Sequence, residues 1–245
     1  HIGELTGPES LDFYQESIPH LQSVLEVAPP QVACDLHPDY LSSRHARALG
    51  LPCTGVQHHH AHVGAVLAEQ GLDGPVLGLV LDGTGYGGDG TVWGGEVLRA
   101  DRSSGTRLGR LAHLPLPGGD RAAREPWRMA LALLHRSLGR RVLDPANQPE
   151  SLRAIDPQRQ ALLVEMIERG LNTPPTSSCG RLFDAVSALL GLCMVSRYEG
   201  EAAMLLEHQA TLAPAGDDPG RYPVQLSAAD GLVVLDSAPL GSLLC

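Results

Sequence analysis

Lysine is absent from this chain of 245 residues, because all 18 of its basic residues are arginine. The sequence given can therefore supply neither the lysine of a P-loop nor a lysine that forms a Schiff base with a substrate. Acidic residues number 28, and the formal net charge is −10. A protein that binds nucleic acid over a broad surface needs a basic face, so we expect no nucleic-acid partner.

Long apolar runs, a signal sequence and clustered cysteines are missing as well. No stretch reaches the roughly 18 apolar residues of a membrane helix, and residues 1–5 lack the charged and apolar segments of a signal peptide. The five cysteines include no C-x-x-C pair, which favours reduced thiols over a disulfide framework. We expect a cytoplasmic protein without a membrane anchor. Since the chain does not begin with Met and ends at Cys245, we also expect it to be a segment of a longer protein.

Hydrophobic periodicity separates a strand-rich first half from a helical second half. The expected strands are 31–35, 54–57, 75–82 and 90–99, with two weaker ones at 224–226 and 232–235. The expected helices are 39–49, 58–70, 127–138, 158–169, 181–192 and 200–209. This order predicts an α/β fold with a mixed sheet and two lobes, a β-rich lobe at 1–116 and a mainly helical lobe at 117–245.

The histidine run at 58–62 is the sharpest local motif. On a helix, residues four apart share a face, so His58 and His62 can present two imidazoles to one metal ion. The alternative is a polar helix end with solvated histidines. Asp82, at the end of a buried strand, is the candidate third ligand, and iron or zinc is the expected ion.

A glycine-rich segment at 82–90 follows the strand 75–82 and is predicted to form the turn to the next strand. Glycines allow a close backbone approach to a ligand, and exposed N–H groups can bind a phosphate. An ordinary hairpin turn with a bulge explains the same pattern. A Rossmann fingerprint is excluded, because no helix is expected directly after the loop.

Two further acidic residues near predicted helix starts are candidate ribose ligands. Asp120 follows Gly118 and Gly119, and Asp184 lies near the start of the 181–192 helix. For each residue taken by itself, the simpler explanation is preferred: a helix cap for Asp120 and a favourable helix-dipole contact for Asp184. No nucleophile with an adjacent base is evident, so we assign no catalytic residue beyond the metal site and expect transfer between bound reactants.

Taken in order, these motifs resemble those of the HypF hydrogenase-maturation carbamoyltransferases over almost the whole chain. The motifs that carry the resemblance lie at residues 1–5, 33–40, 56–62, 81–87, 93–96, 115–120, 124–128, 177–184 and 198–203. The resemblance implies a Kae1-like domain of the actin/Hsp70/sugar-kinase (ASKHA) superfamily, here incomplete at both ends.

The family's activity, as the resemblance implies it, begins with carbamoyl-adenylate made from ATP and carbamoyl phosphate in a YrdC-like domain of the parent chain. The Kae1-like domain then transfers the carbamoyl group to the C-terminal cysteine of the partner HypE, and the product becomes the cyanide ligand of [NiFe]-hydrogenase.

The same resemblance assigns His58, His62 and Asp82 to the metal site. It places a further set of residues along the adenylate, namely Gly83, Thr84, Gly85, Gly118, Gly119, Asp120, Gly180, Asp184, Gly200 and Glu201.

The sequence departs from the family pattern at its ends. The lysine-containing segment before His1 and the Asp-Gly-Gly motif after Cys245 are missing. We therefore expect the chain by itself not to transfer a carbamoyl group, and exposed strand edges to favour a dimer or aggregation. Two other functions remain open: an O-carbamoyltransferase acting on a small natural product, and a non-catalytic nucleotide-binding docking module.

Overall fold

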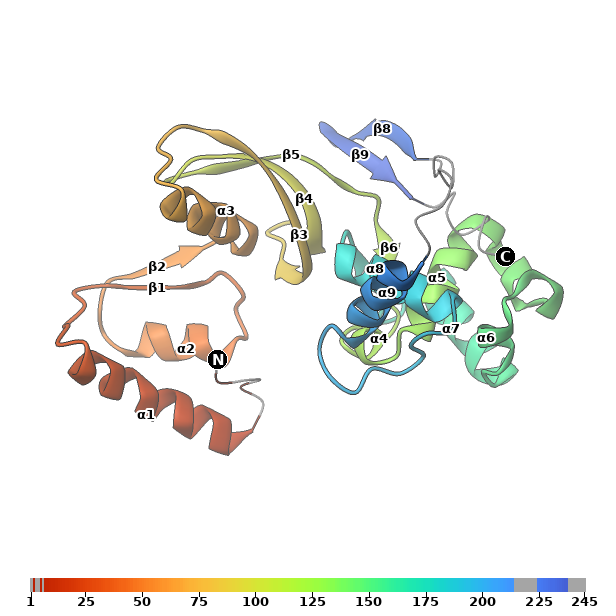
Figure 1. Cartoon of the computed structure of the whole chain (residues 1–245), viewed down its shortest axis with the longest axis horizontal. Helices are drawn as coiled ribbons and strands as arrows, with labels where there is room; N and C mark the ends of the chain where they lie inside the picture. Colours follow the sequence, from red (N-terminus) through yellow and green to blue (C-terminus); the bar gives the residue numbers. More distant parts are fainter. Residues whose placement is uncertain (1, 3–4, 6, 214–223, 238–245) are drawn as a thin grey trace. The chain divides into compact units, whose positions relative to one another are not determined.

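The computed structural model describes residues 2, 5, 7–213 and 224–237. It divides into two compact units, residues 1–61 and residues 62–245. The boundary falls inside α3 (His58–Glu69), which is one continuous helix (Figure 1). The division into lobes at residue 116 stays a prediction.

The first unit contains two parallel strands and two helices before α3 begins. Strand β1 (Val32–Asp35) pairs in parallel with β2 (Cys53–Val56), and α2 (Leu41–Ala48) connects them. Helix α1 (Pro8–Val24) was not expected from the sequence. It buries no residue completely, and Pro19 lies inside it, where proline is disfavoured.

The second unit is built on a seven-stranded mixed sheet. The strands follow the order β6-β7-β4-β5-β9-β8, and β3 pairs with β4. Their bounds are β3 Val76–Tyr86, β4 Val92–Ala100, β5 Gly105–Leu111, β6 Leu114–Pro115, β7 Pro175–Thr176, β8 Gln225–Ala229 and β9 Leu232–Asp236. The sheet confirms the predicted α/β fold, although it also recruits strands from the second half of the chain.

Helix α3 covers one face of the β3–β4 hairpin. Val63 and Leu67 of α3 are buried against Val80 and Leu98, which form a small apolar cluster. Gly78 makes this contact close, because a Cβ built there would lie 2.6 Å from the Val63 Cγ2 atom. The packing fixes the orientation of the helix that carries the histidine run.

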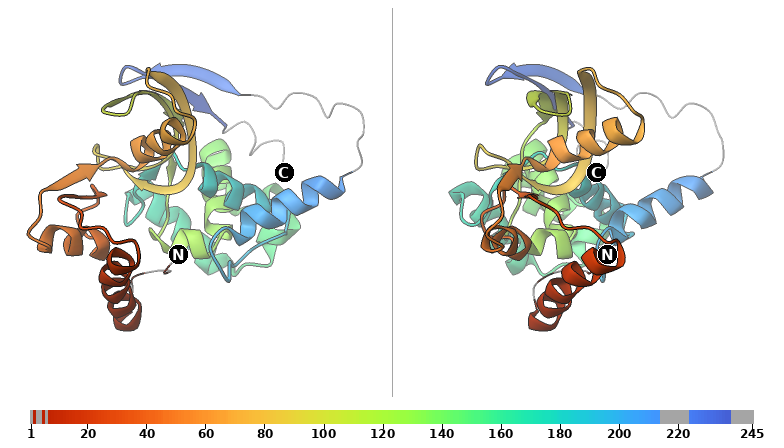
Figure 2. Two further views of the ribbon diagram at one scale, coloured as in Figure 1. Left: turned by 60° about the vertical axis from the view of Figure 1, so that its left-hand side comes forward. Right: turned by 90° about the vertical axis from the view of Figure 1, so that its left-hand side faces the viewer.

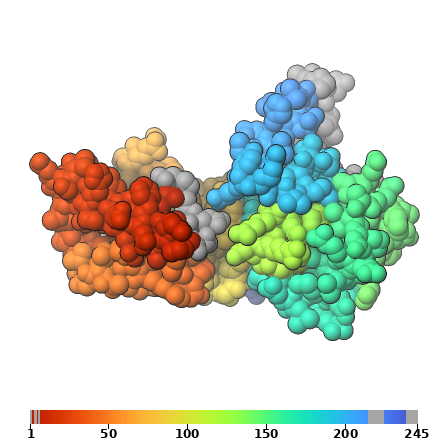
Figure 3. Space-filling model, turned by 90° about the horizontal axis from the view of Figure 1, so that it is seen from below, coloured from red at the N-terminus to blue at the C-terminus, as the bar shows by residue number. Residues whose placement is uncertain are grey.

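The helical part of the second unit holds the main core. Helix α5 (Trp127–Leu138) has the predicted bounds, and every residue from Trp127 to Leu134 is buried. The other helices are α4 Arg121–Arg124, α6 Glu150–Arg153, α7 Pro157–Arg169, α8 Cys179–Leu189 and α9 Glu201–Leu212, with short 3₁₀ turns at Gly139–Leu143 and Pro145–Asn147. In the space-filling view these segments, coloured lime to blue, lie against one another (Figure 3).

The glycine-rich segment differs from its predicted form. Strand β3 continues through Gly83, Thr84 and Gly85 to Tyr86, so the turn to β4 occupies only residues 87–91. The register shifts at this point. Leu81 pairs with Gly95 and Gly85 pairs with Trp93, so β3 advances by four residues where β4 advances by two. The predicted turn is therefore a bulge within the strand, and bulges commonly redirect the side chains at a functional site.

The two weak strands near the end of the chain do not form a separate element. Strand β9 pairs in parallel with β5, and β8 pairs with β9, so the hairpin extends the sheet of the first half (Figure 2). None of the helices in the described part of the chain has the length and apolar character that a membrane span requires.

Candidate functional site

The paired histidines lie on one face of α3, one turn apart. His58 is the first residue of the helix and His62 is the fifth. His59, in contrast, is fully buried, and its Nδ1 lies 3.2 Å from the side-chain nitrogen Nε2 of Gln57. Of these three histidines, the helix presents His58 and His62 one turn apart, and their role as metal ligands stays a prediction.

Asp82 approaches the histidines from β3, at the start of the bulge. Its Oδ2 lies 3.8 Å from Nε2 of His62. One ligand atom from each of His58, His62 and Asp82 lies within 4.8 Å of the other two. Two imidazoles and a carboxylate are a donor set that proteins use for divalent zinc or iron. By the chemistry of their donors, these residues fit the predicted metal.

The glycines of the bulge lie against the N-terminus of α8. Ser178 donates its hydroxyl to the Gly83 carbonyl oxygen at 2.6 Å, and the Ser178 oxygen also accepts from the Arg181 backbone N–H. A Cβ built on Gly180 would lie 2.9 Å from the Gly83 Cα, so only glycine permits this approach. The structure thus brings Gly83 close to Gly180, which is about a hundred residues further along the chain, and both were predicted to bind the adenylate.

Asp184 lies one turn further along α8 and is buried, with 3% of its surface exposed. Burial raises the pKa of this carboxyl to about 6, although Arg181 opposes the shift with an ion pair of 2.6 Å. A buried carboxylate with a shifted pKa near a glycine-lined helix start is a feature of functional sites. Asp184 is thus paired with Arg181 within α8, and its contact with a ribose stays a prediction.

Gly200 and Glu201 form the start of α9, which packs against α8. Gly200 has a φ of +79°, a conformation that favours glycine. Glu201 is buried and accepts hydrogen bonds from the backbone N–H and the guanidinium of Arg197, which lower the pKa of its carboxyl. Its side chain is thus held by Arg197.

The glycine loop at residues 118–120 contacts a different part of the protein, near Asn172. The N–H of Gly118 donates to the Asn172 carbonyl at 2.8 Å, and both Gly118 and Gly119 have positive φ. Asp120 precedes α4 without capping it through its side chain. Among the described residues, no hydrogen bond is recorded between the 118–120 loop and the β3 glycines, so the predicted convergence of all the loops stays a prediction.

Gly118 borders a hollow of about 280 Å³. Arg121, Arg128 and Arg159 line this hollow, and all three bond to Glu125, which is largely buried. The guanidinium groups of Arg128 and Arg159 also lie over Trp127. Because Glu125 already pairs with each arginine, the cluster is explained as an ion-pair network that holds α4, α5 and α7 together.

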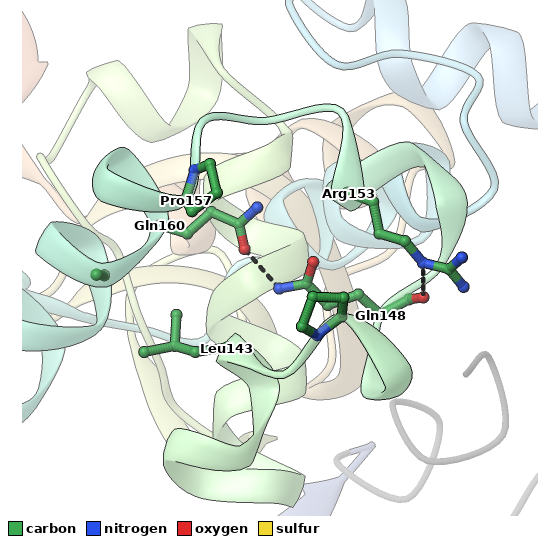
Figure 4. Close-up of a pocket in the computed structure, with 7 residues that line it drawn as sticks. Leu143, Gln148, Arg153, Pro157 and Gln160 are labelled. Carbon is green, nitrogen blue, oxygen red and sulfur yellow. Dashed lines mark hydrogen bonds between the residues drawn. The ribbon is translucent and has the colours of Figure 1, made fainter.

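A larger hollow of about 420 Å³ lies among the helices, lined by Leu143, Gln148, Arg153, Pro157 and Gln160 with two neighbours (Figure 4). Gln148 donates to Gln160 at 2.5 Å and to the Val142 carbonyl at 2.6 Å. Gln160 in turn donates to the Leu152 and Ile155 carbonyls. These buried amides are satisfied within the protein, so the hollow supports no ligand assignment.

Two acidic residues near the sites had no predicted role. Glu96 is fully buried, accepts from Arg107 Nε at 2.7 Å, and bonds the Ser177 hydroxyl in the segment that leads into α8. Asp35 bonds His58. Both acidic residues lie in motifs that carried the resemblance, but nothing in their local sequence shows which side chain they face.

Two family models match consecutive parts of the chain. Residues 1–69 match the family described as HypF Kae1-like domain. Residues 78–243 match the family described as Carbamoyltransferase, Kae1-like Domain, second subdomain. The carbamoyltransferase HypF of Rhizobium leguminosarum bv. viciae is 51% identical over 207 residues, covering 84% of this chain and 26% of the relative. HypF2 of Cupriavidus necator is 48% identical over 227 residues, covering 90% of this chain and 27% of the relative.

Two solved structures share the fold. The full-length HypF crystal structure in a phosphate- and nucleotide-bound form superposes with a TM-score of 0.85 and 35% identity, covering all of this chain and 30% of its own. The T. kodakarensis HypF structure gives a TM-score of 0.84 and 33% identity, covering 99% of this chain and 32% of its own. The chain spans about a quarter to a third of the length of these relatives. On the family matches and the shared fold, the chain belongs to the HypF carbamoyltransferase family and represents its Kae1-like domain.

Proposed function

We propose that this chain is the Kae1-like part of a carbamoyltransferase that moves a carbamoyl group from carbamoyl-adenylate to the C-terminal cysteine of HypE. Two observations together support the proposal: the chain matches both family models, and His58, His62 and Asp82 lie close enough to share one metal ion. In the cytoplasm, the product would supply the cyanide ligand of [NiFe]-hydrogenase. A YrdC-like domain of the parent chain would make carbamoyl-adenylate from ATP and carbamoyl phosphate.

The reaction requires no covalent intermediate on this chain. The cysteine sulfur of HypE attacks the carbamoyl carbon, a C–S bond forms, and the bond from that carbon to the phosphate oxygen breaks. AMP leaves with the electron pair, and the thiol proton passes to solvent. The chain's task is then to hold the adenylate and the acceptor in position, which by itself supplies a large part of the rate enhancement of a transfer between two bound reactants.

Within this proposal, His58, His62 and Asp82 hold a divalent iron or zinc ion. Such an ion supplies Lewis-acid polarisation of a carbamoyl or phosphate oxygen. The contribution of the chain is to fix the ligands: α3 sets the histidine spacing, and the bulge in β3 directs Asp82.

The adenylate would lie along Gly83, Thr84 and Gly85, beside the N-terminus of α8. Backbone N–H groups at a helix N-terminus favour an anion such as a phosphate. The close approach of Gly180 to Gly83 supports this placement, as does the phosphate- and nucleotide-bound state named for the similar HypF structure. Asp184, Gly200 and Glu201 would hold the nucleoside, and the Gly118, Gly119 and Asp120 loop would complete the site.

The test uses the complete parent protein with ATP, carbamoyl phosphate and HypE, and intact-protein mass spectrometry detects a carbamoyl group on HypE. We expect His58→Ala and His62→Ala each to lower the rate of adduct formation by about 10²–10³-fold, the usual cost of losing one electrostatic stabiliser of a transition state. Asp39→Ala is the control, because the Asp39 side chain is exposed and forms an ion pair with Arg44, which is also exposed. Unchanged rates in both histidine variants would refute the proposal.

A further inference from the structure

Beside the proposed metal site, Asp35 meets one of its ligands from a different element. The Asp35 Oδ2 atom lies 2.8 Å from Nδ1 of His58, the first histidine of the run. Asp35 ends β1, and His58 follows β2 by two residues, so the parallel pairing of these strands brings them together. Both residues belong to the first unit.

The contact decides which nitrogen of His58 carries the proton. An ionised carboxylate can only accept hydrogen bonds, so Nδ1 of His58 must be the donor. In a neutral ring the lone pair then resides on Nε2. An i, i+4 pair on a helix can direct both Nε2 atoms toward one ion, and Nε2 is also the atom of His62 that lies nearest to Asp82.

Asp35 is itself held firmly in place. Its other oxygen, Oδ1, accepts the backbone N–H of His37 at 2.7 Å, and its main-chain oxygen accepts the hydroxyl of fully buried Ser43 at 2.9 Å. The Asp35 side chain is only 16% exposed. A carboxylate that is fixed in this way can determine the orientation of the imidazole and is not merely a mobile surface partner.

The start of α3 is fixed by a second bond. The side-chain oxygen of Gln57 accepts the backbone N–H of His60 at 2.9 Å, which satisfies one of the N–H groups left without a partner at a helix start. The first turn of α3, which begins at His58, is therefore held by Gln57, and the His58 ring is held by Asp35.

We infer that Asp35 is a positioning residue for the metal site, which sets the tautomer and orientation of His58 so that Nε2 binds the ion. The inference rests on the proposed metal site. Carboxylates that bond the remote nitrogen of a metal-binding histidine typically contribute about 10–100-fold to metal affinity.

The test measures Zn²⁺ and Fe²⁺ affinity of the chain by competition with a chelating indicator. Asp35→Ala should weaken binding by about 10–100-fold. Asp35→Asn should weaken it less, because the amide oxygen still accepts from Nδ1 although the charge is lost. Asp39→Ala, four residues away and exposed, is the matched control and should bind like the unchanged chain. His58→Ala reports whether the metal uses this histidine at all.

A second readout needs no metal. The ¹⁵N chemical shifts of the His58 ring distinguish the two tautomers, and Asp35→Ala should move the ring from the Nδ1–H form toward a mixture. If Asp35→Ala does not fold, the nearly isosteric Asp35→Asn variant carries both measurements. Denaturant unfolding of each variant separates a loss of stability from a loss of metal affinity.

The outcomes separate the two proposals. Absence of metal binding, or unchanged binding in His58→Ala, would overturn the proposed metal site, while the tautomer shift would still test Asp35. Wild-type affinity and an unchanged tautomer in Asp35→Ala, together with weak binding in His58→Ala, would overturn the inference about Asp35 alone.

Discussion

Asp184 shows at the scale of one residue how burial changes chemistry. Its pKa is raised from 3.8 to about 6 by burial, with Arg181 acting in the opposite direction. Between these two pH values the Asp184 carboxyl is therefore protonated in the folded state, whereas in the unfolded chain it has already lost its proton. The resulting stabilisation is complete below about pH 3.8 and is lost as the pH rises through about 6.

Replacing Asp184 with Asn should remove this dependence. Between pH 4 and pH 7 the unchanged chain should lose stability relative to the Asp184→Asn variant. We expect the loss in unfolding free energy to be on the order of 3 kcal/mol. Urea unfolding at a series of pH values measures it. Asp73→Asn, at an exposed ion pair, is the control and should give a flat difference. A flat curve for Asp184→Asn as well would show that the buried carboxyl titrates normally.

At the scale of elements, the contact between β3, β4 and the start of α8 depends on glycine. A Cβ built on Gly94 would lie 2.6 Å from the Asp82 carbonyl oxygen and 2.8 Å from the Ser178 Cα. Both of these are backbone atoms, which cannot move away as the end of a flexible side chain could. Gly94 thus determines how closely the helix approaches the bulge that carries Asp82.

The variant Gly94→Ala should therefore cost about 1–3 kcal/mol of stability, as overpacking of a tight contact does. It should also weaken ATP binding, if the adenylate lies beside α8 as proposed. Gly88→Ala is the matched control in the same hairpin, since a Cβ there meets nothing within 4 Å. Denaturant unfolding and calorimetry with ATP provide the measurements, and equal behaviour of the two variants would contradict the argument.

At the scale of the whole molecule, the face of β3 opposite α3 is apolar and open. Leu77, Leu79 and Leu81 alternate with the residues that pack toward α3, and their exposed fractions are 71%, 70% and 55%. In the described sheet, β3 pairs with β4 alone. An exposed apolar strand of this kind promotes association with another chain.

We expect the chain to self-associate through this face at micromolar concentrations, the range in which exposed strand edges cause aggregation. Replacing Leu77 and Leu79 together by Thr, which suits a strand, should shift the equilibrium toward monomer. Sedimentation velocity measures the change. Leu162→Thr removes a leucine that is 60% exposed on α7 and should leave the association unchanged. Association that persists in the double variant would place the contact elsewhere.

The sequence by itself determined most of the elements and the identity of the metal-binding candidates. Helix α5 has its predicted bounds because its apolar residues recur at helical spacing between Pro126 and Gly139. His58 and His62 were identifiable because their relation is local: four residues on a helix define one face whatever the rest of the chain does. Helix α1 was not predicted although Leu11, Tyr14, Ile18 and Leu21 recur at helical spacing, and Pro19 interrupts that pattern.

Contacts between distant segments were decided only by the tertiary structure. Cys34 and Cys53 show this simply: 19 residues apart and without a motif, their sulfur atoms lie 3.6 Å apart across β1 and β2. The start of α8 packs closely against the segment 82–83 of β3 because Gly94 and Gly180 have no side chain in the way. Asp35 faces His58 because two strands pair in parallel. Sequence patterns report the period of a single element, whereas these contacts depend on strand register and on how closely two backbones approach, which no single segment encodes.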